Sequence, residues 1–287
     1  MNMRVGVVAA VILALGAFSL TGCTPDAPST DDISVAVYQT RPDQAERRLE
    51  ISVTNRSNEI MTISRAEFTS TQFAETVAWQ KDSTRVLPNV AVDLPVLLSA
   101  AECGSNTIES TVTIDYAVGD GPTQTVELTP VDKYHRMEQL RVEDCIGQSL
   151  ARHVVLELST LPRAVTSHGR TVAELDLTVT PTGADGSATV DAILSTVLFA
   201  VTDPATGETP ASVPLDIAVD ATSTPRTITL EVIPSRCDPH AVAEDKRGTV
   251  FPFTVTTSDG TAGTAFVAAT PEVKAALFAF VGVACGT

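Results

Sequence analysis

An internal repeat is the feature that most constrains the fold of this 287-residue chain. The segment LEISVT, which begins at Leu49, matches LDLTVT, which begins at Leu175, with the same alternation of apolar and polar residues. Unrelated segments rarely share landmarks in the same order, so we interpret the two halves as copies of one structural unit. The other aligned landmarks are ISVAV at Ile33 and VVLEL at Val154, Phe73–Ala74 and Phe199–Ala200, Asp120–Gly121 and Asp259–Gly260, Thr129–Pro130 and Thr270–Pro271, Lys133 and Lys274, and two pairs of cysteines.

The cysteines indicate how each copy is closed. If Cys23 has another role, four cysteines remain, and four allow three pairings. Because the repeat makes each copy self-contained, we favour Cys103 with Cys145 and Cys237 with Cys285, and bridges between the copies are the alternative. The favoured bridges close loops of 42 and 48 positions. Loop-closure entropy then predicts about 4 kcal/mol of stabilisation per bridge.

Composition and pattern predict an all-β fold. Aromatic residues make up only 5% of the chain, and the abundance of Val and Thr favours strands. Short alternating runs predict roughly seven strands per copy, as in an antiparallel β-sandwich. We therefore predict two tandem sandwich domains of immunoglobulin-like outline, at residues 33–148 and 149–287. Trp79 precedes Cys103 instead of lying between the two cysteines, which departs from true antibody domains and leaves the strand topology open.

Threonine–proline pairs predict a short helix in each domain. Thr129 precedes Pro130, and Thr270 precedes Pro271. Threonine is a good helix N-cap, and proline at the first helical position loses no needed hydrogen-bond donor. We expect a helix of one or two turns at each pair, followed by the last strand of the domain.

The first 22 residues have the layout of a secretory signal peptide, because Arg4 is followed by an uncharged apolar run from Val5 to Leu20. This run has 16 residues, and a helix needs roughly 20 to span a bilayer. A permanent membrane helix is therefore the weaker alternative.

The residues that follow suggest a lipid anchor. Leu20, Thr21, Gly22 and Cys23 resemble the lipobox of bacterial lipoproteins. This resemblance implies a diacylglycerol thioether on Cys23 and a location at the extracytoplasmic face of the bacterial membrane. Two acyl chains give durable attachment where one chain is marginal. Residues 23–32 contain two prolines and three aspartates and predict an extended acidic tether.

Net charge argues against nucleic acid as a partner. Removal of the leader takes away Arg4 and leaves 18 basic against 35 acidic residues, a net charge of −17. Binding to phosphates requires clustered Lys and Arg that release counterions. We therefore expect no nucleic-acid partner.

The two copies differ most clearly near their final cysteines, where polar residues of the first copy become apolar in the second. Such an apolar stretch must be covered, either by the protein itself or by a partner molecule. Burial within the protein is the simpler explanation, and a partner surface is the alternative. The pairs that differ are Glu138 and Phe278, Arg141 and Val281, and Glu143 and Val283.

No catalytic motif is present. The sequence lacks the HExxH, GxSxG and GxxxxGK patterns, and with 35 acidic residues, paired carboxylates are expected by chance. We predict no enzyme activity, no cofactor and no metal site. The expected function is a binding or scaffolding module that contacts an envelope protein or a glycan. The alternatives are a solute-binding component of a transporter and a hydrolase of envelope polymers.

Overall fold

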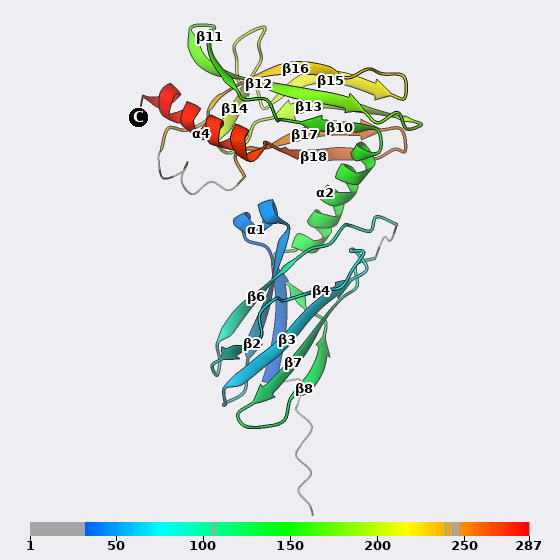
Figure 1. Cartoon of the computed structure of the whole chain (residues 1–287), viewed down its shortest axis with the longest axis vertical. Helices are drawn as coiled ribbons and strands as arrows, with labels where there is room; N and C mark the ends of the chain where they lie inside the picture. The colour runs from blue at the N-terminus through cyan, green and yellow to red at the C-terminus, as the bar shows by residue number, and fades with distance from the viewer. Residues whose placement is uncertain (1–31, 105–106, 239, 241, 243–246, 287) are drawn as a thin grey trace, which may run out of the picture.

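The computed structural model describes residues 32–104, 107–238, 240, 242 and 247–286, which form two β-sandwich domains placed end to end (Figure 1). Strands between Ile33 and Asp132 form domain 1, and strands between Val154 and Ala268 form domain 2. Helix α2 (Arg136–Ala151) connects the two domains. The chain enters domain 1 at the end farthest from domain 2 (Figure 1).

Domain 1 consists of two sheets. One has the strand order β6-β2-β1-β9, and the other has the order β4-β3-β7-β8, with β5 also paired to β3. Helix α1 (Arg41–Glu46) connects β1 to β2. The strands are β1 (Ile33–Tyr38), β2 (Arg48–Asn55), β3 (Met61–Ser70), β4 (Val77–Ala78), β5 (Thr84–Val86), β6 (Ala91–Leu97), β7 (Ser110–Val118), β8 (Gln124–Leu128) and β9 (Val131–Asp132).

Domain 2 has the same two-sheet arrangement. One sheet has the order β10-β12-β16-β14, with β11 also paired to β12, and the other has the order β15-β13-β17-β18. Helix α4 (Pro271–Cys285) follows the last strand. The strands are β10 (Val154–Glu157), β11 (Arg163–Ser167), β12 (Arg170–Pro181), β13 (Ser187–Leu194), β14 (Phe199–Thr202), β15 (Ser212–Asp220), β16 (Arg226–Pro234), β17 (Val250–Thr257) and β18 (Ala262–Ala268).

Strand pairing reproduces the sequence repeat in detail. β1 pairs antiparallel with β2 and parallel with β9, while β10 pairs antiparallel with β12 and a parallel bridge joins Leu158 to Ala269. A bulge interrupts β3 beside β7 at Ser64, and an equivalent bulge interrupts β13 beside β17 at Asp191. Because bulges are specific local features, their recurrence indicates that the two domains share one backbone plan.

Alternating apolar residues place two hydrophobic cores between the sheets. Strand β2 has the burial pattern expected of a strand with one face in a core, and β12 repeats it. One buried cluster belongs to domain 1 and the other to domain 2. The predicted all-β class with tandem antiparallel sandwiches is therefore confirmed. The core residues of these two strands are Leu49, Ile51 and Val53, and Leu175, Leu177 and Val179.

The prediction of short helices before a last strand is wrong in both domains. Thr129–Pro130 is followed by β9, and α2 begins only at Arg136, where Asp132 accepts hydrogen bonds from the backbone N–H groups of Arg136 and Met137 at 2.9 Å each. Helix α2 has 16 residues and contains Cys145. No described strand follows it within domain 1.

The second pair, Thr270–Pro271, does begin a helix. The Thr270 side chain accepts a hydrogen bond from the backbone N–H of Val273, but α4 has 15 residues and itself ends domain 2 at Cys285. The buried residues of α4 recur at helical spacing, so the expected last strand before Cys285 is a helix instead. The buried residues of α4 are Val273, Leu277, Phe280 and Val281.

Helix α2 contributes to both hydrophobic cores. Met137 and Leu140 belong to the cluster of domain 1, and Ile146 and Leu150 belong to the cluster of domain 2. The predicted division between residues 148 and 149 therefore falls inside a continuous helix. Because the two halves of one helix are buried in different cores, the two domains are mechanically coupled.

Candidate interaction surface

Cys23, the residue expected to carry the lipid, lies outside the described residues. Lipidation therefore remains a prediction from the sequence. Among residues 32–286, no described helix combines the length and apolarity that crossing a membrane would require.

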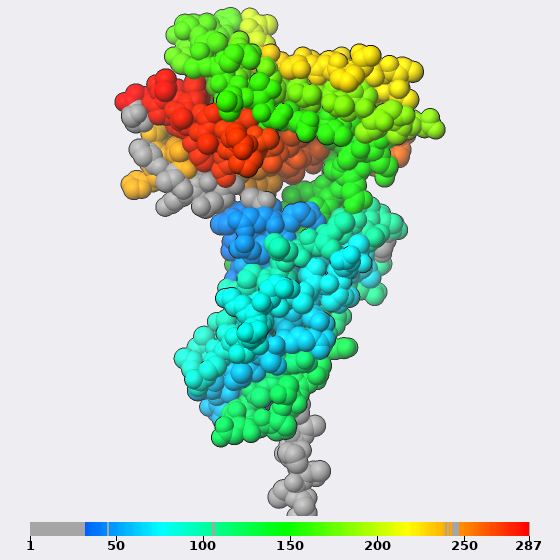
Figure 2. All heavy atoms as spheres, viewed as in Figure 1, coloured from blue at the N-terminus to red at the C-terminus, as the bar shows by residue number. Residues whose placement is uncertain are grey.

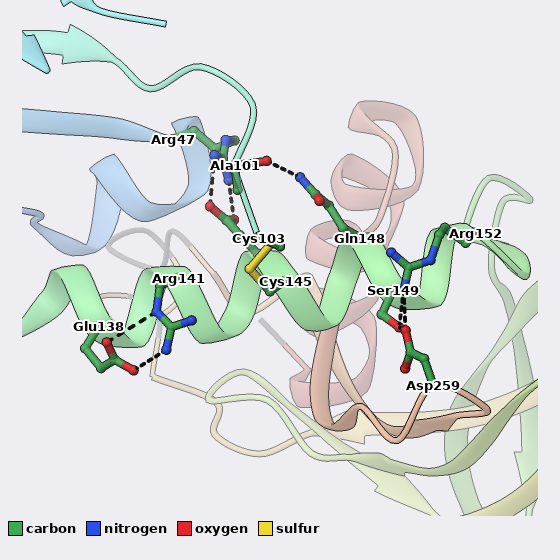
Figure 3. The surroundings of a disulfide bond; sticks show 11 residues. Arg47, Ala101, Cys103, Glu138, Arg141, Cys145, Gln148, Ser149, Arg152 and Asp259 are labelled. Atoms are coloured by element: carbon green, nitrogen blue, oxygen red, sulfur yellow. Dashed lines mark hydrogen bonds and ion pairs between the residues drawn. A yellow bond between two sulfur atoms is a disulfide. The ribbon is translucent and has the colours of Figure 1, made fainter. Parts of the chain in front are cut away.

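Both predicted disulfides are present. Cys103 is bonded to Cys145 on α2, and Cys237 is bonded to Cys285 on α4, with a Cα–Cα distance of 5.5 Å in each bridge. Each bridge attaches the terminal helix of a domain to the chain that follows a strand of its own domain, β6 or β16. Figure 3 shows the first bridge, between Cys103 and Cys145. The pairing within each repeat is confirmed.

Around Cys145, α2 is held to domain 1 by polar contacts as well as by sulfur (Figure 3). Arg47 donates to both carboxylate oxygens of Asp144, at 2.5 and 3.1 Å. One turn further along, the Gln148 side chain donates to the Ala101 carbonyl at 2.5 Å. These contacts surround the disulfide and fix the middle of the helix to the first sandwich.

Beyond Gln148, the polar contacts of α2 are with domain 2 (Figure 3). Ser149 lies 2.9 Å from the Thr257 hydroxyl and donates to Asp259 at 2.9 Å, and Arg152 forms an ion pair with the same carboxylate. Hydrogen bonds from Thr257, Thr261 and Ser149 lower the pKa of Asp259 below its usual range. Asp259, in the turn between β17 and β18, thus binds the C-terminal end of α2 through Ser149 and Arg152.

The apolar contact beneath this network is close. Ile146 on α2 faces Gly263 on β18, and a Cβ added to Gly263 would lie 2.4 Å from the Ile146 Cδ1 atom. A second contact between the domains runs from Arg247, which donates to the side chain of Gln44 on α1. The guanidinium of Arg247 also lies over the Phe266 ring, 4.8 Å from its centroid.

The three residues predicted as a partner surface do not form one exposed face. Val281 is buried at 4% exposure, and Phe278 is partly buried against the core of domain 2. The Lys274 ammonium lies 5.7 Å from the centroid of the Phe278 ring. Only Val283 is well exposed, at 69%. Phe278 and Val281 are three residues apart and lie on one face of α4, whereas Val283 is two residues beyond Val281 and points away from that face, so the prediction that treated all three as one side is wrong.

Val283 instead borders a groove that the sequence analysis did not anticipate. The groove lies between α4 and the β11–β12 hairpin and has a volume of about 190 Å³. Figure 2 shows α4 in red at the surface beside this hairpin in green. Counted back from the final cysteines, the alanines before Cys285 stand where longer polar side chains precede Cys145, and this difference in side-chain length is the signal in the sequence for a hollow beside α4. The lining residues, all apolar, are Pro162, Ala164, Ala173, Ala276, Ala279, Phe280 and Val283.

Other candidate site chemistry is limited. The described residues contain no group of three or more His, Cys, Asp or Glu side chains arranged to hold a metal ion. A polar hollow of about 560 Å³ lies at the tip of domain 2, between His168, Arg170 and the loop after β14. His168 hydrogen-bonds to the Pro204 carbonyl at 3.0 Å and Arg170 donates to the Gly207 carbonyl, so both side chains hold that loop in place.

Comparison with known proteins adds no family. No family model matches the chain, and no curated protein matches it. The fold defines a class of protein, tandem β-sandwiches with one disulfide in each domain. The similar solved structures are weak matches. They include the B domain of a biofilm associated protein, at 8% identity over 82% of this chain and 85% of that chain, with a TM-score of 0.25.

Two further structures show the same low level of similarity. The BSP domain of a biofilm associated protein matches at 9% identity over 85% of this chain and 60% of that chain, with a TM-score of 0.24. A chaperone and tip adhesion subunit complex from the archaic Csu pili of Acinetobacter baumannii matches at 9% identity, over 83% of this chain and 99% of that chain, with a TM-score of 0.20. A shared fold does not transfer function, so none of these matches assigns an activity.

Proposed function

We propose that this protein is a membrane-anchored extracytoplasmic lipoprotein that acts as a binding or scaffolding module at the bacterial cell envelope. The observation that carries the proposal is helix α2, whose two halves are buried in the cores of the two domains. A connection of this kind supports a rigid two-domain rod rather than two domains on a flexible linker.

The place where the chain enters domain 1 indicates which end of the rod would lie at the membrane. The chain enters domain 1 at the end opposite domain 2 (Figure 1). A lipid on Cys23, joined to β1 by a short acidic tether, would keep domain 1 next to the membrane and hold domain 2 away from it. Domain 2 is then the part that meets an envelope protein or a glycan.

The anchor is tested by metabolic labelling with a clickable fatty acid, followed by membrane fractionation. We expect the wild-type protein to be labelled and to sediment with the membrane, and the C23A variant to be neither. Cys103→Ser with Cys145→Ser is the control, because it removes two cysteines without touching the lipobox. Wild-type protein without label would contradict the anchor.

Binding is tested with residues 24–287, which contain both hydrophobic cores and both disulfides. We expect the immobilised fragment to recover the same envelope component in repeated experiments from solubilised envelopes. A fragment that has been reduced, alkylated and unfolded is the control for adhesion to exposed apolar surface. If the folded fragment recovers nothing beyond this control, the binding function is contradicted.

A further inference from the structure

The turns at the entry end of domain 1, opposite domain 2 in Figure 1, converge on the buried side chain of Asn55. This amide donates to the Val86 carbonyl at 2.9 Å, and the Asn55 backbone N–H donates to the Val90 carbonyl at 3.1 Å. The N–H of Arg56 donates to the carbonyl of Asp32, the first described residue, at 2.7 Å. The turns are therefore fixed around the point where the chain enters the domain.

One of these turns, between β5 and β6, presents two apolar side chains to solvent. Leu87 is 55% exposed and Val90 is 44% exposed. The Val90 N–H donates to the Leu87 carbonyl at 3.1 Å, and Pro88 and Asn89 stand between them, with a φ of 58° at Asn89. Proline at the second position and a positive φ at the third define a type II turn. Because the proline restricts the backbone, both side chains are held at the surface.

The repeat shows that the fold does not require apolar residues at this turn. Counted from the bulges in β3 and β13, Leu87 corresponds to Asp220 of domain 2. Counted from the pairing of β2 with β6 and of β12 with β16, Val90 corresponds to Thr224. Asp220 and Thr224 are exposed and polar. Only domain 1 therefore exposes large apolar side chains at these two positions.

The length of the preceding chain indicates which surface this end meets. Residues 24–31 separate Cys23 from Asp32, which is eight residues. A fully extended chain spans at most about 3.6 Å per residue, so Cys23 lies within about 30 Å of Asp32. A lipid on Cys23 would hold this end of the domain, with its apolar turn, close to a bilayer.

Charge at the entry end is mixed. Arg56 and Arg85 are exposed, and neither forms an ion pair with a described residue. The carboxylates of Glu59 and Asp120 lie at the same end and line a hollow of about 510 Å³ together with Arg85. Since the two signs balance, contact with a bilayer depends on the apolar side chains, while the two guanidinium groups are available to lipid phosphates.

We propose that the turn from Leu87 to Val90 is a membrane contact, in which both apolar side chains enter the boundary between lipid headgroups and acyl chains. This proposal rests on the proposed function, because the anchor on Cys23 brings the turn to the membrane. Two side chains bind a bilayer weakly by themselves, but the short tether gives them a high effective concentration at its surface. Lipid and turn then hold domain 1 at two points, which fixes its orientation.

The test uses the mature chain, residues 23–287, and supplies the anchor chemically. Four of the five cysteines form disulfides, so Cys23 is the free thiol that couples to a maleimide lipid in phosphatidylcholine nanodiscs. A second lipid carries a spin label near the headgroup end of its acyl chain. We expect the methyl NMR signals of Leu87 and Val90 to be lost, and those of Leu97 to remain. Leu97 is 64% exposed and ends β6 at the opposite end of the strand.

A double variant, Leu87→Asp with Val90→Thr, gives this turn the residues that domain 2 carries there. The methyl group of Ile60, which lines the same hollow as Pro88, then reports on the contact. The Ile60 signal should be broadened in the wild type and should recover in the double variant. Leu97→Asp is the matched control, because it also replaces an exposed leucine of domain 1 by aspartate, and it should leave Ile60 broadened.

The outcomes separate this contact from the anchor. Signals of Leu87 and Val90 that persist in the coupled wild type would overturn the membrane contact, as would an Ile60 signal that is equally broadened in the double variant. Because the coupling replaces the natural lipid, neither result depends on acylation of Cys23. Absence of the fatty-acid label in cells would contradict the proposed anchor instead.

Discussion

At the scale of single residues, the junction between the domains depends on two unlike contacts. Asp259 collects hydrogen bonds from its own hairpin and from Ser149 of α2. Gly263 allows Ile146 to approach the backbone of β18. One contact is electrostatic and exposed, and the other is steric and buried, so they should respond differently to pH and to substitution.

Asp259→Asn should lower the melting temperature of the protein at neutral pH. The pKa of Asp259 is lowered in the folded protein, so its stabilisation is present above the ordinary aspartate pKa of about 4 and is lost as the pH falls toward the folded value. The difference between wild type and variant should therefore shrink below about pH 4. Calorimetry across pH measures this.

Asp120→Asn is the matched control, because Asp120 occupies the equivalent Asp–Gly turn of domain 1, away from α2. A loss at neutral pH that is equal in the two variants would show that the contact with α2 contributes nothing. A difference for Asp259→Asn that grows in acid would contradict the sign of the pKa effect.

Gly263→Ala should destabilise the protein by about 1–3 kcal/mol, because the new Cβ would overlap the Ile146 side chain and because Gly263 has a φ of 153°, which residues with a side chain rarely adopt. Ile146→Val removes the overlapping Cδ1 atom and should recover part of that loss in the double variant. Gly147→Ala is the control in α2, since nothing lies within 4 Å of its added Cβ. Urea unfolding measures the free energy of unfolding of each variant. If the loss in the double variant equals the sum of the losses in the two single variants, the contact between Gly263 and Ile146 is contradicted.

At the scale of elements, the strands were predictable and the helices less so. Alternation in LEISVT and LDLTVT identifies β2 and β12 directly, because a strand with one buried face must alternate. The repeat also gave the disulfides, since the two domains are closed separately. The strands were predicted correctly because a half-buried strand has a strict period of two residues, and the disulfides because each repeat contains its own pair of cysteines.

Helix lengths and the groove could not be obtained in the same way. Two residues before each final cysteine, Glu143 forms a partly buried ion pair with Arg136, and Val283 is exposed. The sequence difference had suggested that Val283 is buried or covered by a partner. Whether an apolar residue is covered depends on which strand of the sheet lies beside it. That is a property of the tertiary arrangement and not of the local pattern.

Removal of the bridge between domain 1 and α2 is predicted to cost about 4 kcal/mol, because Cys103→Ser with Cys145→Ser opens a loop of 42 positions. Removal of the second bridge opens 48 positions and should cost a similar amount. Urea unfolding of both double variants measures the two losses. A loss below about 1 kcal/mol for the first bridge would show that the polar contacts of Asp144 and Gln148 retain α2 without it.

At the scale of the whole molecule, α2 makes two duplicated sandwiches into one body. Its first half is buried with Met137 and Leu140, and its second half with Ile146 and Leu150. Arg247 and Gln44 add a contact away from the helix. If Cys23 is the anchor, this coupling determines how far domain 2 stands from the membrane and in which direction its groove faces.

Residual dipolar couplings of residues 24–287 test this coupling most directly. Each domain contributes backbone N–H couplings from its own strands, and each set defines an alignment tensor. We predict that one tensor, with the orientation of the domains shown in Figure 1, fits both sets. Two tensors of different magnitude would show that the domains reorient independently, and would contradict the account of α2 as a rigid connection.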